Sequence, residues 1–105
     1  MPSTPTYLAY VLDRLAPVAA DITTRPMMGE YLLYYRGTLV GGIYDDRLLV
    51  KPTPAARHLL PTAPQEPPYP GARPLLLVDS LDTPGLLPRL LPAIASDRPG
   101  RPRKQ

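Results

Sequence analysis

The sequence predicts an α+β domain in which an antiparallel sheet, built around a central meander, is flanked by helices in the order α-β-β-β-β-α-β-α. Three observations carry this prediction. Between residues 25 and 52, runs rich in Tyr, Leu, Val and Ile are separated by three turn signals, Gly29, Arg36-Gly37 and Asp45-Asp46. Such runs suit pleated, half-buried strands joined by tight turns. Aliphatic residues recur at helical spacing on both sides of this segment, and 105 residues fit one small domain.

The first helix is predicted to begin with Thr4 as its N-cap and Pro5 as its first residue, because proline has a fixed φ and lacks an N–H that this position leaves unused. Pro17 disfavours helical geometry in the residue before it, so the helix should end near Ala16. Four aliphatic residues repeat at i, i+3, i+4 and i+7 and form one stripe for the core: Leu8, Val11, Leu12 and Leu15.

The strands of the sheet are predicted in residues 22–26, 30–35, 38–44 and 47–51. The first contains Pro26, which cannot donate to a ladder, and so it should be an edge or end early. Two-residue turns connect the last three strands and fix their antiparallel order. The pair Gly41-Gly42 indicates a bulge or the close approach of another backbone.

The second half of the chain is less regular. Thr53-Pro54 repeats the capping signal and should open a short helix over 55–60, followed by a proline-rich loop over 61–74. The apolar run 75–78 predicts a strand covered on both faces. A last helix should start near residues 82–84, but Pro88 and Pro92 predict that it starts late or is kinked.

The composition divides the chain into a folded part, 1–96, and a basic tail, 97–105, that has no apolar side chain and should be disordered. The net charge of +3 comes from four tail cations, Arg98, Arg101, Arg103 and Lys104. Without these four, the chain has eight Lys and Arg residues and nine Asp and Glu residues. Direct, specific DNA binding is therefore not expected, because duplex binding commonly neutralises about 6–10 phosphates.

Few residues of this chain are of types that could act in catalysis or bind a metal. There is no cysteine and one histidine, His58, so thiolate nucleophiles and cysteine-ligated metals are excluded and an imidazole base would have to be this residue. The adjacent acids Asp45 and Asp46 are explained by a turn. We therefore predict no enzyme activity, no metal and no cofactor. No secretion signal or membrane-spanning run occurs, which predicts a cytoplasmic protein that makes no membrane contact.

The residues expected to bind a partner lie on the meander. Aromatic side chains are enriched at protein interfaces, and the meander carries Tyr31, Tyr34, Tyr35 and Tyr44. Adjacent strand residues point to opposite faces, so Tyr34 and Tyr35 cannot both enter the core. The charged residues Arg25 and Glu30 complete this candidate surface, and the simplest interpretation of that pair is a salt bridge.

The landmarks Met-Gly, Tyr-Arg-Gly, Gly-Gly-Ile-Tyr-Asp and Leu-Leu-Val-Lys-Pro resemble the amino-terminal domain of the TfoX/Sxy proteins, regulators associated with bacterial natural competence. The resemblance implies helices flanking a mixed or antiparallel sheet, similar to secretion chaperones. Full-length members carry a second, helical domain, so this chain resembles a stand-alone amino-terminal domain.

Two functions remain open. The first is a non-enzymatic regulatory module that acts through protein contacts, including a homodimer through an exposed strand edge as one form. The alternative is a nucleic-acid-associated transcriptional co-regulator whose basic tail supplies weak attachment to DNA.

Overall fold

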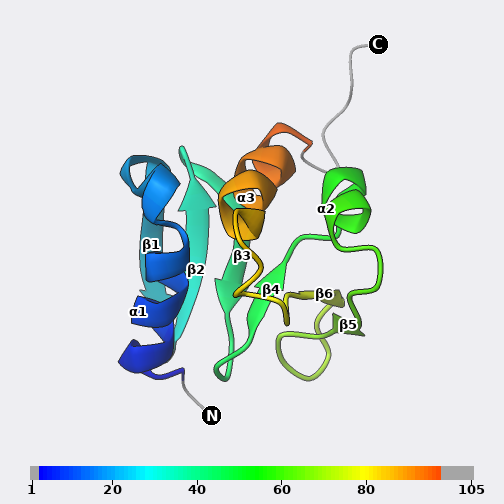
Figure 1. The fold of residues 1–105 in the computed structure, drawn as a ribbon. Helices are drawn as coiled ribbons and strands as arrows, with labels where there is room; N and C mark the ends of the chain where they lie inside the picture. Colours follow the sequence, from blue (N-terminus) through cyan, green and yellow to red (C-terminus); the bar gives the residue numbers. More distant parts are fainter. Residues whose placement is uncertain (1–2, 98–105) are drawn as a thin grey trace.

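The computed structural model describes residues 3–97 and shows a six-stranded antiparallel sheet of order β1-β2-β3-β4-β6-β5 (Figure 1). The α+β class is confirmed. The elements in chain order are α1 Pro5–Arg14, β1 Ile22–Met27, β2 Glu30–Tyr35, β3 Thr38–Ile43, β4 Leu48–Val50, α2 Pro54–Leu59, β5 Gln65–Glu66, β6 Leu75–Leu77 and α3 Leu86–Ser96.

Helix α1 begins as the sequence predicts. The Thr4 hydroxyl accepts a hydrogen bond from the Tyr7 N–H at 3.1 Å, which satisfies one of the donors that a helix start leaves unpaired. The α-helix ends at Arg14, before Pro17. A 3₁₀ segment, Ala16–Asp21, then leads into β1. This segment was not predicted, and it carries the chain from the helix to the edge of the sheet.

The three meander turns have positive φ at both central positions. The φ values are 53° and 87° at Met28-Gly29, 49° and 82° at Arg36-Gly37, and 53° and 54° at Asp45-Asp46. Turns of this hand match the twist of antiparallel strands. The adjacent acids Asp45 and Asp46 are therefore turn residues, as predicted.

The pair Gly41-Gly42 marks both a bulge and a close backbone approach. Leu33 pairs with Gly41 but Tyr34 pairs with Leu39, so one residue of β3 is extra. A Cβ added at Gly41 would lie 2.3 Å from the Leu49 carbonyl oxygen of β4. Only glycine allows β3 and β4 to pack at this point.

The proline-rich segment contains a strand that the sequence did not predict. Gln65–Glu66 forms β5 and pairs with Leu75 and Leu76 of β6. These two residues lie between Pro64 and Pro67 and keep their backbone N–H groups, so a two-residue ladder forms within a segment that was predicted to be loop.

Helix α3 starts late, which confirms one of the two alternatives for this segment. Gly85, with a φ of 73°, precedes its first residue Leu86, so Pro88 falls in the first turn, where its missing N–H breaks no helical bond. Pro92 is the proline inside the helix.

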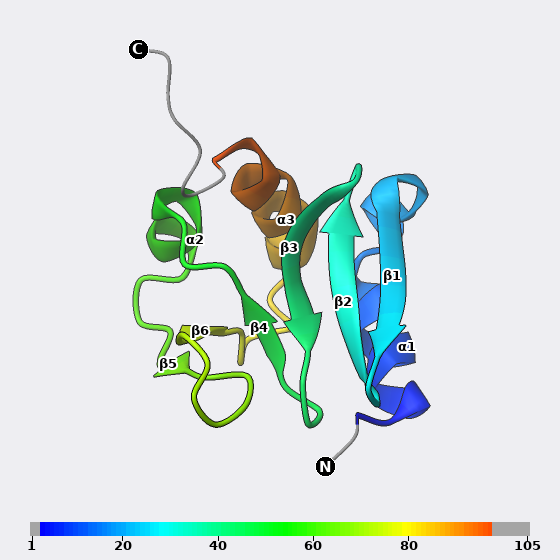
Figure 2. The same ribbon diagram turned by 180° about the vertical axis from the view of Figure 1, so that it is seen from behind.

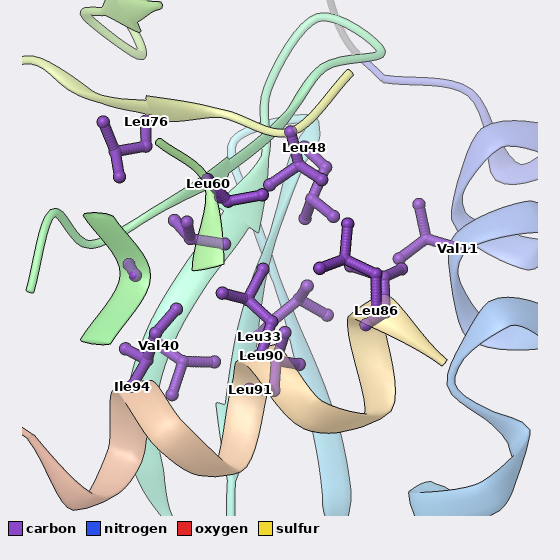
Figure 3. Close-up of a cluster of buried hydrophobic side chains, with 14 of the residues drawn as sticks. Val11, Leu33, Val40, Leu48, Leu60, Leu76, Leu86, Leu90, Leu91 and Ile94 are labelled. Atoms are coloured by element: carbon purple, nitrogen blue, oxygen red, sulfur yellow. The ribbon is translucent and has the colours of Figure 1, made fainter. Parts of the chain in front are cut away.

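The core lies between the sheet and helices α1 and α3 (Figure 3). Helix α3 turns its aliphatic stripe onto strand residues that include Leu33 and Val40. Its buried residues are Leu86, Leu87, Leu90, Leu91 and Ile94. Val11 of α1 and Leu15, the residue that follows the helix, are fully buried, whereas Leu12 is partly exposed and outside the main cluster. Seen from behind, strands β1, β2 and β3 carry no helix (Figure 2).

Candidate interaction surface on the open sheet face

The sheet has one face covered by helices and one face without them, which we call the open face. On β2, Tyr31, Leu33 and Tyr35 pack against the main core. Their neighbours must point the other way, so Tyr34 lies on the open face. The prediction that Tyr34 and Tyr35 face opposite sides is confirmed.

The open face has a buried patch of its own, away from the main core cluster. Leu49 is fully buried and Tyr44 is 7% exposed, yet neither belongs to the main cluster. Register places Leu49 beside Gly42 on this face. A Cβ added at Gly42 would lie 2.8 Å from Cε2 of Tyr44, so this glycine leaves the space that the Tyr44 ring occupies.

Next to Tyr44 the open face holds a hollow of about 510 Å³. Three segments line it: the β1–β2 turn region, the end of β3 and the β5–β6 loop. Its lining residues are Met27, Met28, Glu30, Tyr44, Pro68 and Tyr69. Among the described residues, the large hydrophobic side chains that are exposed are Met28 at 96%, Tyr69 at 57% and Met27 at 36%. All three line this hollow.

The amino-terminal segment fixes one wall of the hollow. Oε1 of Glu30 accepts hydrogen bonds from the Ser3 N–H (3.1 Å), the Ser3 hydroxyl (2.6 Å) and the Asp45 N–H (3.0 Å). The Ser3 hydroxyl also accepts from the Asp46 N–H at 3.1 Å, and the Thr4 N–H donates to the Asp46 carboxylate at 2.8 Å. Both hairpin turns at this end of the sheet are thereby tied to the start of α1.

The predicted salt bridge between Arg25 and Glu30 is wrong, since no ion pair joins these two described residues. The Glu30 oxygen binds Ser3 and Asp45 instead. Arg25 lies opposite Leu32 in the register, two positions along the strand from the pair formed by Met27 and Glu30, and is exposed on the open face.

Arg47 holds the other wall. Its guanidinium forms an ion pair with Glu66 at 2.7 Å and donates to the carbonyls of Tyr44 at 3.1 Å and Pro68 at 3.2 Å. Hydrogen bonds to a charged donor are stronger than neutral ones. The contacts fasten the β5–β6 loop, and with it Tyr69, to the β3–β4 turn.

Tyr44 has an unusual environment for a phenol. Burial raises the pKa of Tyr44, and the nearby Tyr69, Glu30 and Tyr34 raise it further. Its hydroxyl forms no hydrogen bond with the described part of the chain. This hydroxyl belongs to a residue that lines the hollow, and it can therefore receive a hydrogen bond from a bound group.

The sequence identified part of this site. Of the predicted residues, Glu30 and Tyr44 line the hollow. Tyr34 lies close enough to Tyr44 to raise its pKa. Tyr31 and Tyr35 pack against the core instead. The residues missed are Met27, Met28, Pro68 and Tyr69. One signal was present, because Met27-Met28 places two large apolar residues beside a turn glycine. Nothing in the sequence placed the β5–β6 loop next to that turn.

The remaining candidate features of the sequence lie elsewhere in the fold. Within residues 3–97, no group of three or more His, Cys, Asp or Glu is placed to hold a metal ion, and His58 is exposed on α2. None of the helices in this region combines the length and the apolar character that crossing a bilayer requires. The tail cations Arg98, Arg101, Arg103 and Lys104 lie outside the described residues.

Comparison with known proteins gives the family. The model of the TfoX N-terminal domain matches residues 13–78. The chain is also 36% identical over 75 residues to an uncharacterised 12.7 kDa protein encoded in the trpE 5′ region of Spirochaeta aurantia. That match covers 71% of this chain and 64% of the relative, so the chain spans less than two thirds of the relative's length. No solved structure matches significantly. The matched segment runs from the last two residues of α1 through β6 and includes all six residues that line the hollow, and the chain belongs to the TfoX N-terminal domain family.

Proposed function

We propose that this protein is a cytoplasmic, non-enzymatic regulatory module that binds a protein partner through the open face of its sheet. One observation carries the proposal: the helices cover a single face, and the other face presents a hollow with exposed Met28 and Tyr69 at its rim. Clustered exposed apolar residues are typical of interaction sites. The regulatory part of the proposal comes from the resemblance of the chain to competence regulators.

The edge of β1 is a less suitable docking site than the open face. The Arg36 N–H donates to the Asp21 carbonyl at 2.8 Å. In an antiparallel ladder, this bond fixes which residues of β1 direct their backbone N–H and C=O groups toward β2. The residues with backbone groups that point outward are therefore Ile22, Thr24 and Pro26.

Two of those three residues have no free backbone N–H group that could donate a hydrogen bond to a second strand. The Ile22 N–H donates to the Ala19 carbonyl, and Pro26 has no N–H. Thr24 is left as the outward donor on β1. Prolines and short strands are common means of blunting an edge, and the opposite edge, β5, has two residues between Pro64 and Pro67. We therefore place the partner on the open face, and a homodimer would also form there.

Affinity capture with matched variants tests this proposal. The open-face variant is Met28→Ser with Tyr69→Ser, and the helix-face control is Ala9→Ser with Arg89→Ser, since Ala9 and Arg89 are exposed on α1 and α3. We expect at least one protein, or a second copy of the chain, to be enriched by the wild type and the control but lost from the open-face variant. Equal enrichment by both variants, or none by the wild type, would contradict the proposal.

A nucleic-acid-associated role is the second candidate, because four of the twelve Lys and Arg residues fall at 98, 101, 103 and 104. Such binding would be electrostatic and would weaken steeply with salt. Removal of residues 98–105 should abolish it in a filter-binding assay at about 50 mM salt. Binding that survives the truncation would rule out the tail as its source.

A further inference from the structure

We propose that the hollow on the open face receives the side chain of a lysine or arginine carried by an extended segment of the protein partner. This inference rests on the proposed function and adds the chemistry of the ligand. Four properties of the lining support it: apolar walls, aromatic rings, an uncompensated carboxylate and a hydroxyl without a partner.

The walls suit the aliphatic stem of such a side chain. Met27, Met28 and Pro68 supply apolar surface without a hydrogen-bonding side chain. Lysine and arginine bury their methylene stems against apolar groups while the charged end keeps polar contacts. Methionine is flexible and polarisable and adapts to ligands of different shape.

The aromatic residues suit the charged end. Tyr44 and Tyr69 both line the hollow, and cations are attracted to the faces of tyrosine rings. The same chemistry occurs twice among the described residues. The guanidinium of Arg14 lies 5.4 Å from the ring centroid of Tyr10, and that of Arg36 lies 5.6 Å from the centroid of Tyr35.

The charge of the hollow is negative. Among the described residues, Glu30 is the one carboxylate that lines the hollow, and no lysine or arginine of residues 3–97 lines it. The hydrogen bonds to Glu30 from described residues all reach Oε1, which leaves Oε2 for a ligand. Of the two cations near this end of the open face, Arg47 is already paired with Glu66, and Arg25 is exposed and does not line the hollow. A cation entering here gains an opposite charge within the lining itself.

The other classes of ligand fit less well. An aliphatic side chain would cover Glu30 and the Tyr44 hydroxyl without giving either a hydrogen bond, and burial without a bond is unfavourable. A phosphate group, whether on a peptide or on a nucleic acid, would be repelled by Glu30. A guanidinium or ammonium donates to both oxygens.

Nuclear magnetic resonance of protein labelled with ¹³C in its methionine methyl groups tests the proposal directly. The chain has three methionines, and Met27→Leu and Met28→Leu variants would assign the two in the hollow. The probes are four blocked pentapeptides, Gly-Ser-X-Ser-Gly, with arginine, lysine, norleucine or glutamate as X, and a single-stranded oligonucleotide. The arginine and lysine peptides should shift the Met27 and Met28 methyls, with dissociation constants of about 1 mM.

The decisive variant is Glu30→Gln. Glutamine keeps an oxygen that can accept from Ser3 and Asp45, so the wall is retained while the charge is removed. We expect it to weaken binding of the arginine peptide by about tenfold, whereas Asp79→Asn, which neutralises an exposed acid outside the hollow, should leave it unchanged.

Three results would overturn the proposal: equal shifts with the norleucine peptide, larger shifts with the glutamate peptide or the oligonucleotide, or no shift with the cationic peptides. None of these decides the docking face, which the capture experiment tests separately. Equal norleucine binding together with loss of capture by the open-face variant would retain the open face and reject the cation.

Discussion

At the residue scale, Ser3 has more influence than its position near the start of the chain indicates. It is 7% exposed, and its hydroxyl donates to Glu30 and accepts from the Asp46 N–H. Its own N–H donates to the Gly29 carbonyl at 3.0 Å. One serine thus links the β1–β2 turn to the β3–β4 turn and holds the wall of the hollow that contains Glu30.

Ser3→Ala should therefore destabilise the protein more than a surface serine does. The substitution leaves the Asp46 N–H and one bond of Glu30 without a partner, which costs about 1–3 kcal/mol. Ser80→Ala is the matched control, because Ser80 is exposed and should change stability by less than about 0.5 kcal/mol. Urea titration measures both, and equal effects would show that the Ser3 link is not formed.

Tyr44 should make stability depend on pH in the alkaline range. Burial raises its pKa above the ordinary value of 10.0, so above that pH the folded protein keeps a proton that the unfolded chain releases. The free energy of unfolding is unaffected by Tyr44 below about pH 10 and falls as the pH rises through the interval between the unfolded and folded pKa values. In urea titrations at pH 9 to 11, Tyr44→Phe should lose less stability than the wild type, and identical slopes would contradict this assignment.

At the element scale, the strands β3 and β4 pack as closely as glycine permits. Gly41→Ala would place its Cβ 2.3 Å from the Leu49 carbonyl oxygen, a backbone atom that cannot rotate away. We expect a loss of more than about 3 kcal/mol, at the upper end for overpacking. Gly37→Ala meets no atom within 4 Å, and its positive φ should cost about 1–2 kcal/mol. A denaturant titration in which Gly37→Ala is the more costly would contradict the observed strand spacing.

The face by which helix α1 docks differs from its predicted stripe, because Tyr7 packs against the core and Leu12 does not. Leu15 is 1% exposed and belongs to the core cluster, whereas Leu12 does not. Leu15→Ala should cost about 2–5 kcal/mol, as fully buried leucines do, and Leu12→Ala should cost clearly less. If thermal or urea unfolding gave equal losses, the orientation of α1 on the sheet would differ from that described.

The predictable elements were those that local signals determine. Thr4 and Pro5 start a helix through contacts within a few residues, and the turn at Asp45-Asp46 is set by its own backbone, so both could be predicted from the sequence alone. The ladder of β5 depends on β6, about ten residues further along, and the bonds of Ser3 reach residues 27 and 43 positions away. Contacts of that range follow from the packing of the whole chain, and single-sequence patterns do not encode them.

At the scale of the whole molecule, the site is a consequence of the layering. Helices α1 and α3 cover one side of the sheet, and the other side is partly covered by the β5–β6 loop, which leaves a hollow where that loop meets two hairpin turns. The alternating pattern of the meander predicted strands with one core face and one other face, so an open face could be predicted from the sequence. The sequence did not predict that Met28 and Tyr69 would meet at the rim of the hollow, because 41 positions separate them in the chain.

Site-specific photo-crosslinking in cells is the most direct test of the claim that partners bind the open face. A photoreactive phenylalanine analogue would replace Tyr69 at the rim of the hollow in one sample and the exposed Arg89 of α3 in a second. We predict a discrete covalent adduct, with a partner or a second copy, from position 69 and none from position 89. An adduct formed from position 89 alone would place the partner on the helical face and contradict the account.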